Sequence, residues 1–389
     1  MIGTCRFTLA FIVLAVTFGA CTEEDPEATA LAEPDAQAPD MVPDATPEMA
    51  PDAAPDMAPD MMPDPDPEMQ ACEPLETDYA PGADDTWPVC ISDDDTYHQF
   101  EMTISSIGRV AGFEEIADIL WRVEGTPSAD AFLRARDIYA TDEGLDSRVQ
   151  RREDEHYSPV ADMGGESLRC RDEGVPELDP DRCVGPARIL PILNASFQAG
   201  ILGEGNGLVH SARLEAALLW FLYVSSHKEA STCRDKKKDC DSAYAYYTGG
   251  VPREDGLGLA GYFKAMDENV HDRVWDGILA VRCWRDLDTE EVAQDLDTQA
   301  QAIDQLDEAL MNGLSRLVLD RLLRLEGGGD EAEAAWAFVQ ILGGVLLRET
   351  AERDPARASA LEGELSKVAV DDVDAELVSQ TLQDIFPCP

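Results

Sequence analysis

The side chains best suited to chemistry in this chain of 389 residues are five histidines and the carboxylates near them. His98 and Glu101 are three positions apart, so a helix would place them on one face. Imidazole and carboxylate groups that project inward from helices hold metal ions in some helical bundles. We therefore treat His98 and Glu101 as candidate metal ligands, with a solvent-exposed pair as the alternative.

A second polar group follows Arg151 and Arg152, where positions 154–157 have the sequence Asp-Glu-His-Tyr. We expect a charged helix to end here, and capping or surface ion pairs would account for these residues. His156 is retained as a candidate ligand because imidazole binds transition metals well.

Glu215 lies in the most apolar helix that the sequence predicts, which covers about 208–231. Ala216–Val224 has polar side-chain atoms only on Trp220 and Tyr223. A helix that is apolar all round belongs in the centre of a bundle. An unpaired buried charge is costly, so Glu215 needs either an arginine partner or a metal ion, and the sequence leaves both open.

The other three histidines are not expected to bind metal. His210 and Glu215 would lie about 140° apart around their helix, which does not suit a ligand pair. His227 precedes Lys228 beyond the apolar run, which predicts a surface position near the helix end. His271 is interpreted as a structural histidine.

No known catalytic pattern accompanies these residues. The chain has no Gly-x-Ser-x-Gly elbow and no His-Glu-x-x-His sequence. The Gly-rich segment 203–207 is not followed by the Lys-Ser/Thr of a phosphate loop. We therefore expect a protein that is not an enzyme, with a hydrolase as the least favoured interpretation.

The elements that must position these side chains are helices. Apolar residues recur three or four positions apart, and no segment alternates for long with a period of two. A helix capped near 94–96, with a bend at Gly108 or Gly112, and capping boxes at 288–291 and 330–333 add to this pattern. We expect an all-α bundle of about ten helices.

The N-terminus has the pattern of an export signal. Residues 7–18 form a short apolar run after Arg6, and Cys21 follows two small residues. The segment 18–21 resembles a bacterial lipobox, which predicts a lipoprotein signal peptide over 1–20 and a lipid anchor on Cys21. We therefore expect the protein to be located in the bacterial cell envelope. The expected form is an outer-membrane lipoprotein that is held to the membrane by its lipid and faces the periplasm or the cell surface.

Two further regions follow the signal. Residues 21–71 are rich in Pro, Asp and Met. Prolines block regular structure and like charges extend the chain, which predicts a disordered acidic tether. Residues 72–389 are expected to form the helical extracytoplasmic domain.

Eight cysteines remain once Cys5 and Cys21 are set aside, and an even number in an exported protein predicts disulfides. The simplest expectation is sequential pairing. The CxxC spacing of a structural zinc site is absent. The expected pairs are Cys72–Cys90, Cys170–Cys183, Cys233–Cys240 and Cys283–Cys388, which would staple the bundle.

The net charge of −49 excludes nucleic acid as an expected partner, because phosphate recognition needs a basic face. It also disfavours adhesion to anionic lipid. Acidic composition is compatible with cation binding but does not establish it, since charged runs are usually solvated.

Two stretches carry a family resemblance. Leu219–Val224, followed by Lys228–Ala230 and Cys233, and then Ala243–Gly250, resemble the algal low-iron-inducible periplasmic iron-assimilation proteins. The resemblance covers about 190–350 and implies an exported helical protein linked to iron uptake. It makes Glu229 and Tyr247 the matching polar positions. The imelysin-like proteins are a weaker match, because their Gly-x-His-x-x-Glu sequence is not reproduced around His210.

These observations leave two main hypotheses. The first is a lipid-anchored extracytoplasmic binding protein that handles iron or another hard cation through oxygen and imidazole ligands. The second is a non-catalytic envelope protein whose helical domain binds a protein partner. The candidate metal ligands are His98, Glu101, His156, Glu215, Glu229 and Tyr247.

Overall fold

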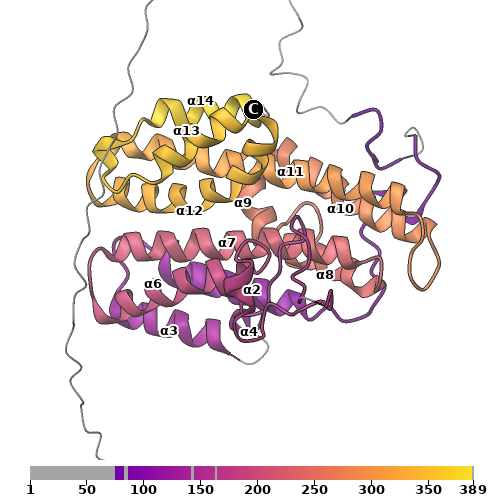
Figure 1. Cartoon of the computed structure of the whole chain (residues 1–389), viewed down its shortest axis with the longest axis horizontal. Helices are drawn as coiled ribbons and strands as arrows, with labels where there is room; N and C mark the ends of the chain where they lie inside the picture. The colour runs from indigo at the N-terminus through magenta and orange to yellow at the C-terminus, as the bar shows by residue number, and fades with distance from the viewer. Residues whose placement is uncertain (1–74, 83–85, 142–143, 163, 388–389) are drawn as a thin grey trace, which may run out of the picture. The chain divides into compact units, whose positions relative to one another are not determined.

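The structure is a computed structural model, and it describes residues 75–82, 86–141, 144–162 and 164–387. The predicted signal peptide, the lipid site Cys21 and the tether lie outside these residues, as do Cys72 and Cys388. Within them the fold consists of thirteen α-helices without a β-strand (Figure 1), so the all-α prediction is confirmed. None of the described helices is both long enough and apolar enough to span a membrane.

The helix α7 (Gly207–Thr232) runs through the middle of the bundle, as its apolar sequence predicts. In Figure 1 it lies between α12 (Gly329–Arg353) on one side and α6 (Leu190–Leu202) with α3 (Ala129–Ala140) on the other. Most α7 side chains are buried, and the hydrophobic effect of this burial is the main force that holds the bundle together.

The other helices surround this centre. They are α2 (Ser106–Leu120), α4 (Leu145–Val149), α5 (Val175–Leu178), α8 (Lys237–Thr248), α9 (Leu259–Met266), α10 (Glu268–Leu287), α11 (Leu296–Leu323), α13 (Pro355–Leu365) and α14 (Ala375–Ile385). Short 3-10 turns occur at η1 (Ile91–Asp94), η3 (Arg324–Gly327) and η4 (Val370–Asp372), and a π-helical turn, η2 (Gly185–Ile189), precedes α6.

Helix starts follow local capping rules where a free side chain is available. The Ser128 hydroxyl accepts a hydrogen bond from the Ala131 N–H at 3.2 Å and begins α3. The Asp354 carboxylate accepts from the Ala356 and Arg357 N–H groups and begins α13. Such caps satisfy backbone donors that a helix start leaves unpaired.

Several local predictions are wrong. Helix α12 begins at Gly329 without a side-chain cap, so Asp330 does not form the predicted capping box. No helix follows Asp94, and α2 begins later and continues through both glycines. Asp288 does not cap a helix, because its carboxylate accepts backbone N–H groups along a loop, among them that of Asp295 at 2.8 Å. The helix predicted to reach His156 ends at Val149, because the Asp154 N–H donates to the Arg182 carbonyl at 2.8 Å.

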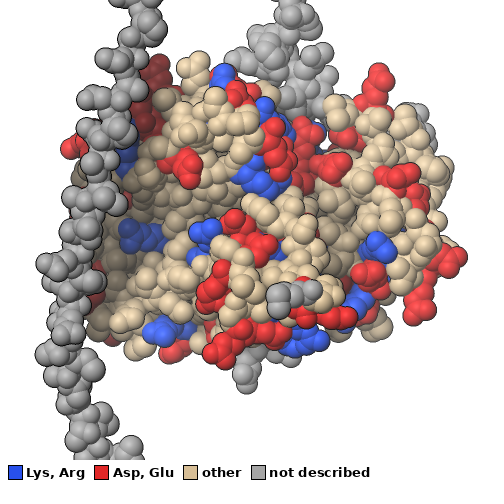
Figure 2. All heavy atoms as spheres, in the orientation of Figure 1, with Lys and Arg blue, Asp and Glu red and all other residues tan. Residues whose placement is uncertain are grey.

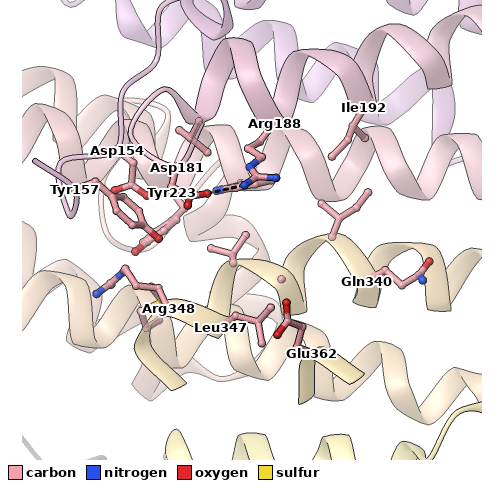
Figure 3. Close-up of a pocket in the computed structure, with 16 residues that line it drawn as sticks. Asp154, Tyr157, Asp181, Arg188, Ile192, Tyr223, Gln340, Leu347, Arg348 and Glu362 are labelled. Atoms are coloured by element: carbon pink, nitrogen blue, oxygen red, sulfur yellow. Dashed lines mark hydrogen bonds and ion pairs between the residues drawn. The ribbon is translucent and has the colours of Figure 1, made fainter. Parts of the chain in front are cut away.

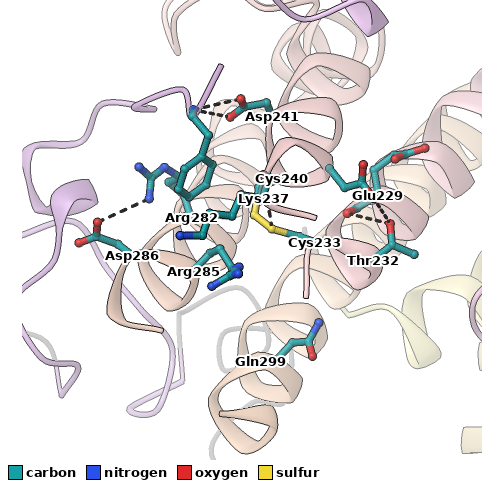
Figure 4. Close-up of a disulfide and its surroundings, with 12 residues drawn as sticks. Glu229, Thr232, Cys233, Lys237, Cys240, Asp241, Arg282, Arg285, Asp286 and Gln299 are labelled. Atoms are coloured by element: carbon teal, nitrogen blue, oxygen red, sulfur yellow. Dashed lines mark hydrogen bonds and ion pairs between the residues drawn. A yellow bond between two sulfur atoms is a disulfide. The ribbon is translucent and has the colours of Figure 1, made fainter. Parts of the chain in front are cut away.

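The disulfides Cys170–Cys183 and Cys233–Cys240 are confirmed, and the second joins α7 to α8 (Figure 4). Cys90 bonds to Cys283 rather than to Cys72, so two of the expected pairs are wrong. The reason is tertiary: η1 packs on α10, where the Ile91 N–H donates to Asp286 at 3.1 Å. The Cys90–Cys283 disulfide closes a loop of 193 residues, which stabilises the fold by about 5 kcal/mol in the chain-entropy model.

Candidate functional site

The six candidate ligands do not come together. His98 bonds to Asp94 at 2.9 Å on the surface, and Glu101 is exposed. Tyr247 is buried, and its hydroxyl lies 2.9 Å from Nδ1 of His271. These three side chains have separate surroundings, so they form no common site.

Glu215 and Glu229 are buried members of ion pairs, and neither is a ligand in a cluster. Glu215 accepts from Arg321 at 2.7 Å and from the Tyr262 hydroxyl at 2.8 Å. Glu229 accepts from the buried Arg152 at 2.8 Å. Both carboxylates therefore have the arginine partner that a buried charge requires.

Only His156, of the six, lies in a group of close metal-ligand atoms. One ligand atom each from Asp154, His156 and His227 lies within 4.8 Å of the others. His156 stands at the centre of this group, because its Nδ1 is 2.6 Å from Asp154 Oδ1 and its Nε2 is 3.0 Å from Asp307 Oδ2. We call Asp154, His156 and His227 the histidine cluster.

His227 is not at the surface, and the expectation that placed it there is wrong. Its side chain comes from α7, is 5% exposed and stacks on the His156 ring with the centroids 3.9 Å apart. Its Nδ1 is buried without a hydrogen-bond partner among the described residues. An unpaired buried polar atom costs about 1–3 kcal/mol, so the position calls for an explanation beyond packing.

The loop that carries Asp154 and His156 is held in shape by Arg182. The guanidinium of this buried arginine donates to the carbonyl oxygens of Asp154 and Tyr157 at 3.0 and 2.9 Å. The disulfide Cys170–Cys183 closes next to it. Gly185 lets η2 approach this loop, because a Cβ there would lie 2.1 Å from the Val149 carbonyl oxygen.

Asp307 supports the cluster from α11, and sequence reasoning missed it. Its Oδ1 accepts from the Tyr223 hydroxyl at 2.9 Å, and its Oδ2 lies 3.4 Å from Arg348 on α12. Burial alone would raise the pKa of Asp307, but the neighbouring imidazoles and Arg348 hold it below its ordinary range. The group therefore stays a carboxylate that orients His156.

The two histidines have opposite protonation states. Burial would lower the pKa of His156, but its hydrogen bonds to Asp154 and Asp307 raise it to about 9. Burial lowers the pKa of His227 to about 4, and the charge on His156 acts in the same direction. At neutral pH an imidazolium thus lies against a neutral imidazole that has a free nitrogen.

A cavity of about 500 Å³ opens beside the histidine cluster. Figure 3 shows Asp154, Tyr157 and Tyr223 gathered at one end, Arg348 beneath them and Gln340 at the far end. On the surface in Figure 2 acidic and basic side chains are interspersed, without a broad basic patch on the face shown. The apolar part of the cavity wall comes from Val184, Ile192, Met311, Ile341, Val345 and Leu347.

In comparisons with known proteins, no family model, no curated protein and no solved structure matches this chain. The function is therefore inferred from the histidine cluster.

Proposed function

We propose that this protein is an extracytoplasmic, lipid-anchored binding protein of the cell envelope that holds a divalent transition-metal ion, iron among them, at Asp154, His156 and His227. The observation that supports this most is that His227, whose buried Nδ1 has no hydrogen-bond partner in the described part of the chain, also has a ring nitrogen within 4.8 Å of ligand atoms of Asp154 and His156. Two imidazoles and one carboxylate are a donor set typical of Fe(II), and imidazole also suits zinc.

The surroundings of His156 favour this role. A metal ion held by Asp154 and His156 would displace the proton that these two side chains share across 2.6 Å. The bond between His156 Nε2 and Asp307 would then provide the support that metal-bound histidines usually have. Tyr223 and Arg348 in turn hold Asp307 in position.

This donor set changes the kind of ion that we expect. Calcium and other hard cations take oxygen ligands, whereas the cluster offers two nitrogens and one carboxylate. The proposed cargo is therefore a borderline divalent ion, such as Fe(II) or Zn(II), rather than calcium.

Thermal unfolding of the metal-stripped full chain tests the proposal. The unfolding temperature is compared without metal and after addition of Fe(II), Zn(II), Mn(II) or Ca(II), with the Fe(II) samples kept anaerobic. Binding to the native state at about 100 times the dissociation constant adds about 2.7 kcal/mol to the free energy of unfolding. We expect this increase with Fe(II) or Zn(II) and not with Ca(II).

Two variants locate the effect. His227→Leu removes one ligand and should abolish the stabilisation by metal. His98→Ala removes an exposed imidazole outside the cluster and should leave it unchanged. If no ion raises the unfolding temperature, the metal proposal is wrong, and the helical domain is better explained as a module that binds a protein.

A further inference from the structure

The metal site, if formed by the histidine cluster, is incomplete without another ligand. Three protein ligands leave at least one coordination position of a tetrahedral ion open, and more of an octahedral one. Asp154 reaches the wall of the 500 Å³ cavity, as does Tyr223, which supports the cluster through Asp307. Of the histidine cluster, Asp154 alone lines the cavity, so the cavity borders the position of an ion on the side of Asp154.

The size and the walls of this cavity fit a small organic molecule. Cavities that bind such ligands have volumes of about 300–1,000 Å³ and combine apolar walls with a few polar groups. Here α12 contributes Ile341, Val345 and Leu347, and α7 contributes the ring of Trp220. Water alone gains little from such an apolar surface.

Two hydrogen-bond donors on the wall are not used by the protein. Neither the Tyr157 hydroxyl nor the Trp220 indole N–H has a hydrogen-bond partner within the described part of the chain. Most other polar groups of the wall are paired, as Figure 3 shows for Arg188 and Asp181, which are 2.8 Å apart. The two free donors favour a ligand that carries acceptor oxygens.

The charges of the wall limit that ligand further. Arg188 is neutralised by Asp181, and Arg348 is shared among Asp307, Glu349 and Glu352. Glu362 adds an exposed carboxylate to the wall. A ligand with several negative charges would be repelled here, whereas one with a single charge on its metal-binding group is tolerated.

We propose that the cavity binds a small bidentate oxygen chelator with an apolar or aromatic body, of the hydroxamate type, which completes the coordination of the metal held by the histidine cluster. This inference rests on the proposed metal-binding function. Under it, the cargo of the protein is a metal chelate and not a bare ion.

Gly344 provides a test that leaves the metal ligands intact. It lies on α12 in the cavity wall, and a Cβ at this position would meet no atom within 4 Å. Gly344→Leu therefore adds an apolar side chain in the cavity wall where its Cβ has room, and leucine is favoured over glycine inside a helix. Gly363→Leu, at an equally open helical glycine that does not line the cavity, is the matched control.

The experiment is calorimetric titration of the zinc-loaded full chain with benzohydroxamate, acetohydroxamate and citrate. We expect benzohydroxamate to bind about tenfold or more tightly than acetohydroxamate, because its ring buries apolar surface, and citrate to bind weakest. Gly344→Leu should weaken benzohydroxamate binding about tenfold or more and retain the stabilisation by zinc. Tyr157→Phe should weaken it about threefold to tenfold, and Gly363→Leu should match the wild type.

The outcomes separate this inference from the proposal on which it rests. If zinc stabilises the protein but benzohydroxamate binds wild type and Gly344→Leu equally, or binds neither, the chelator inference is wrong and the metal site stands. If citrate binds best, the assignment of a singly charged ligand is wrong. If zinc has no effect on unfolding, both the metal site and the chelator are rejected.

Discussion

The central helix α7 carries two buried polar groups that have opposite surroundings. Glu215 and His227 are twelve positions apart, which is about 18 Å of helix. Glu215 has an arginine at 2.7 Å and a tyrosine hydroxyl at 2.8 Å. His227 has a stacked ring beside it and an unpaired nitrogen.

The two groups differ in whether all their polar atoms have partners among the described residues. Around Glu215, Trp121 donates to the Tyr262 hydroxyl at 2.7 Å, so that the network is closed within the protein. Around His227 the donors and acceptors of Asp154, His156 and Asp307 are paired, but the free imidazole nitrogen is not. A buried polar atom without a partner needs an explanation, and a bound ion or water molecule is one.

The largest loss of stability is expected when the hydrogen-bonded network around Glu215 loses its arginine. Arg321→Met keeps an apolar side chain of similar length and removes the guanidinium, which lies over the Phe338 ring and pairs with Glu215. Breaking a buried ion pair in this way costs about 3–5 kcal/mol. Burial already raises the pKa of Glu215, with Arg321 opposing this shift, so its removal raises the pKa further.

The cost of Arg321→Met therefore depends on pH. The loss of stability is full where the unpaired carboxylate is charged, at a pH above its raised pKa. As the pH falls through the raised pKa, Glu215 takes up a proton and the loss shrinks. Denaturant unfolding at pH 8 and pH 5 measures this, with Arg188→Met as the control, since the exposed Arg188–Asp181 pair is worth about 1 kcal/mol or less. If Arg321→Met lost the same amount of stability at both pH values, Glu215 would not be the group whose protonation sets this loss.

A sharper comparison uses the tyrosine that each network contains. Tyr223 donates to Asp307 at 2.9 Å, and Tyr262 donates to Glu215 at 2.8 Å. Replacing either by Phe removes a hydrogen bond to a charged group, worth about 2 kcal/mol at neutral pH. The two losses should respond differently to acid, because the pKa of Asp307 is lowered and that of Glu215 is raised.

The sign follows from the protonation of each carboxylate. Glu215 takes up its proton above its ordinary pKa of 4.5, so the cost of Tyr262→Phe falls between pH 8 and pH 4.5. Asp307 stays ionised until the pH is below its ordinary value of 3.8, so the cost of Tyr223→Phe is constant over the same window. Unfolding curves of both variants at several pH values measure the two losses of stability. If the two losses change with pH in parallel, the difference between Glu215 and Asp307 is refuted.

The smallest effect is expected for His227 in the metal-free protein. His227→Leu removes an unpaired polar atom and keeps an apolar side chain in a buried position. We expect the metal-free variant to be more stable than the wild type by about 1 kcal/mol, because the cost of the unpaired atom disappears. Glu215→Leu, on the same helix, should instead lose stability, since Arg321 loses its partner.

Urea unfolding of the two metal-free variants measures both changes. A loss of stability in His227→Leu comparable to that in Glu215→Leu would show that His227 is a structural residue. In that case the distinction between the closed network and the open cluster would no longer hold.

Local sequence rules determined most of the helices. Ser128 and Asp354 begin helices as capping rules require, and the apolar run of α7 predicts its central position. These features depend on residues within about one or two turns of each other, so a reading of the sequence can find them. The predicted disulfides Cys170–Cys183 and Cys233–Cys240 are likewise local.

His227 was missed because the buried stretch of α7 is longer than its apolar residues. Ser226 bonds to the carbonyl of Leu222 at 3.0 Å, and Ser225 bonds to Phe221 in the same way. Such serines satisfy their own hydroxyls within the helix and can be buried like apolar residues. The run from Ala216 therefore continues to His227, and this is the one signal in the sequence that could have shown it.

The tertiary structure alone decided the candidate site. His156 meets Asp307 across 151 positions of sequence, and Cys90 meets Cys283 across 193. Periodicity and capping describe neighbours within one helix and carry no information about which loop and which helices approach one another. Here Arg182 shapes the loop and the packing of α7, α11 and α12 brings His227, Asp307 and Arg348 to it. The residue types in the sequence supplied the chemistry, and long-range packing selected which of them act together.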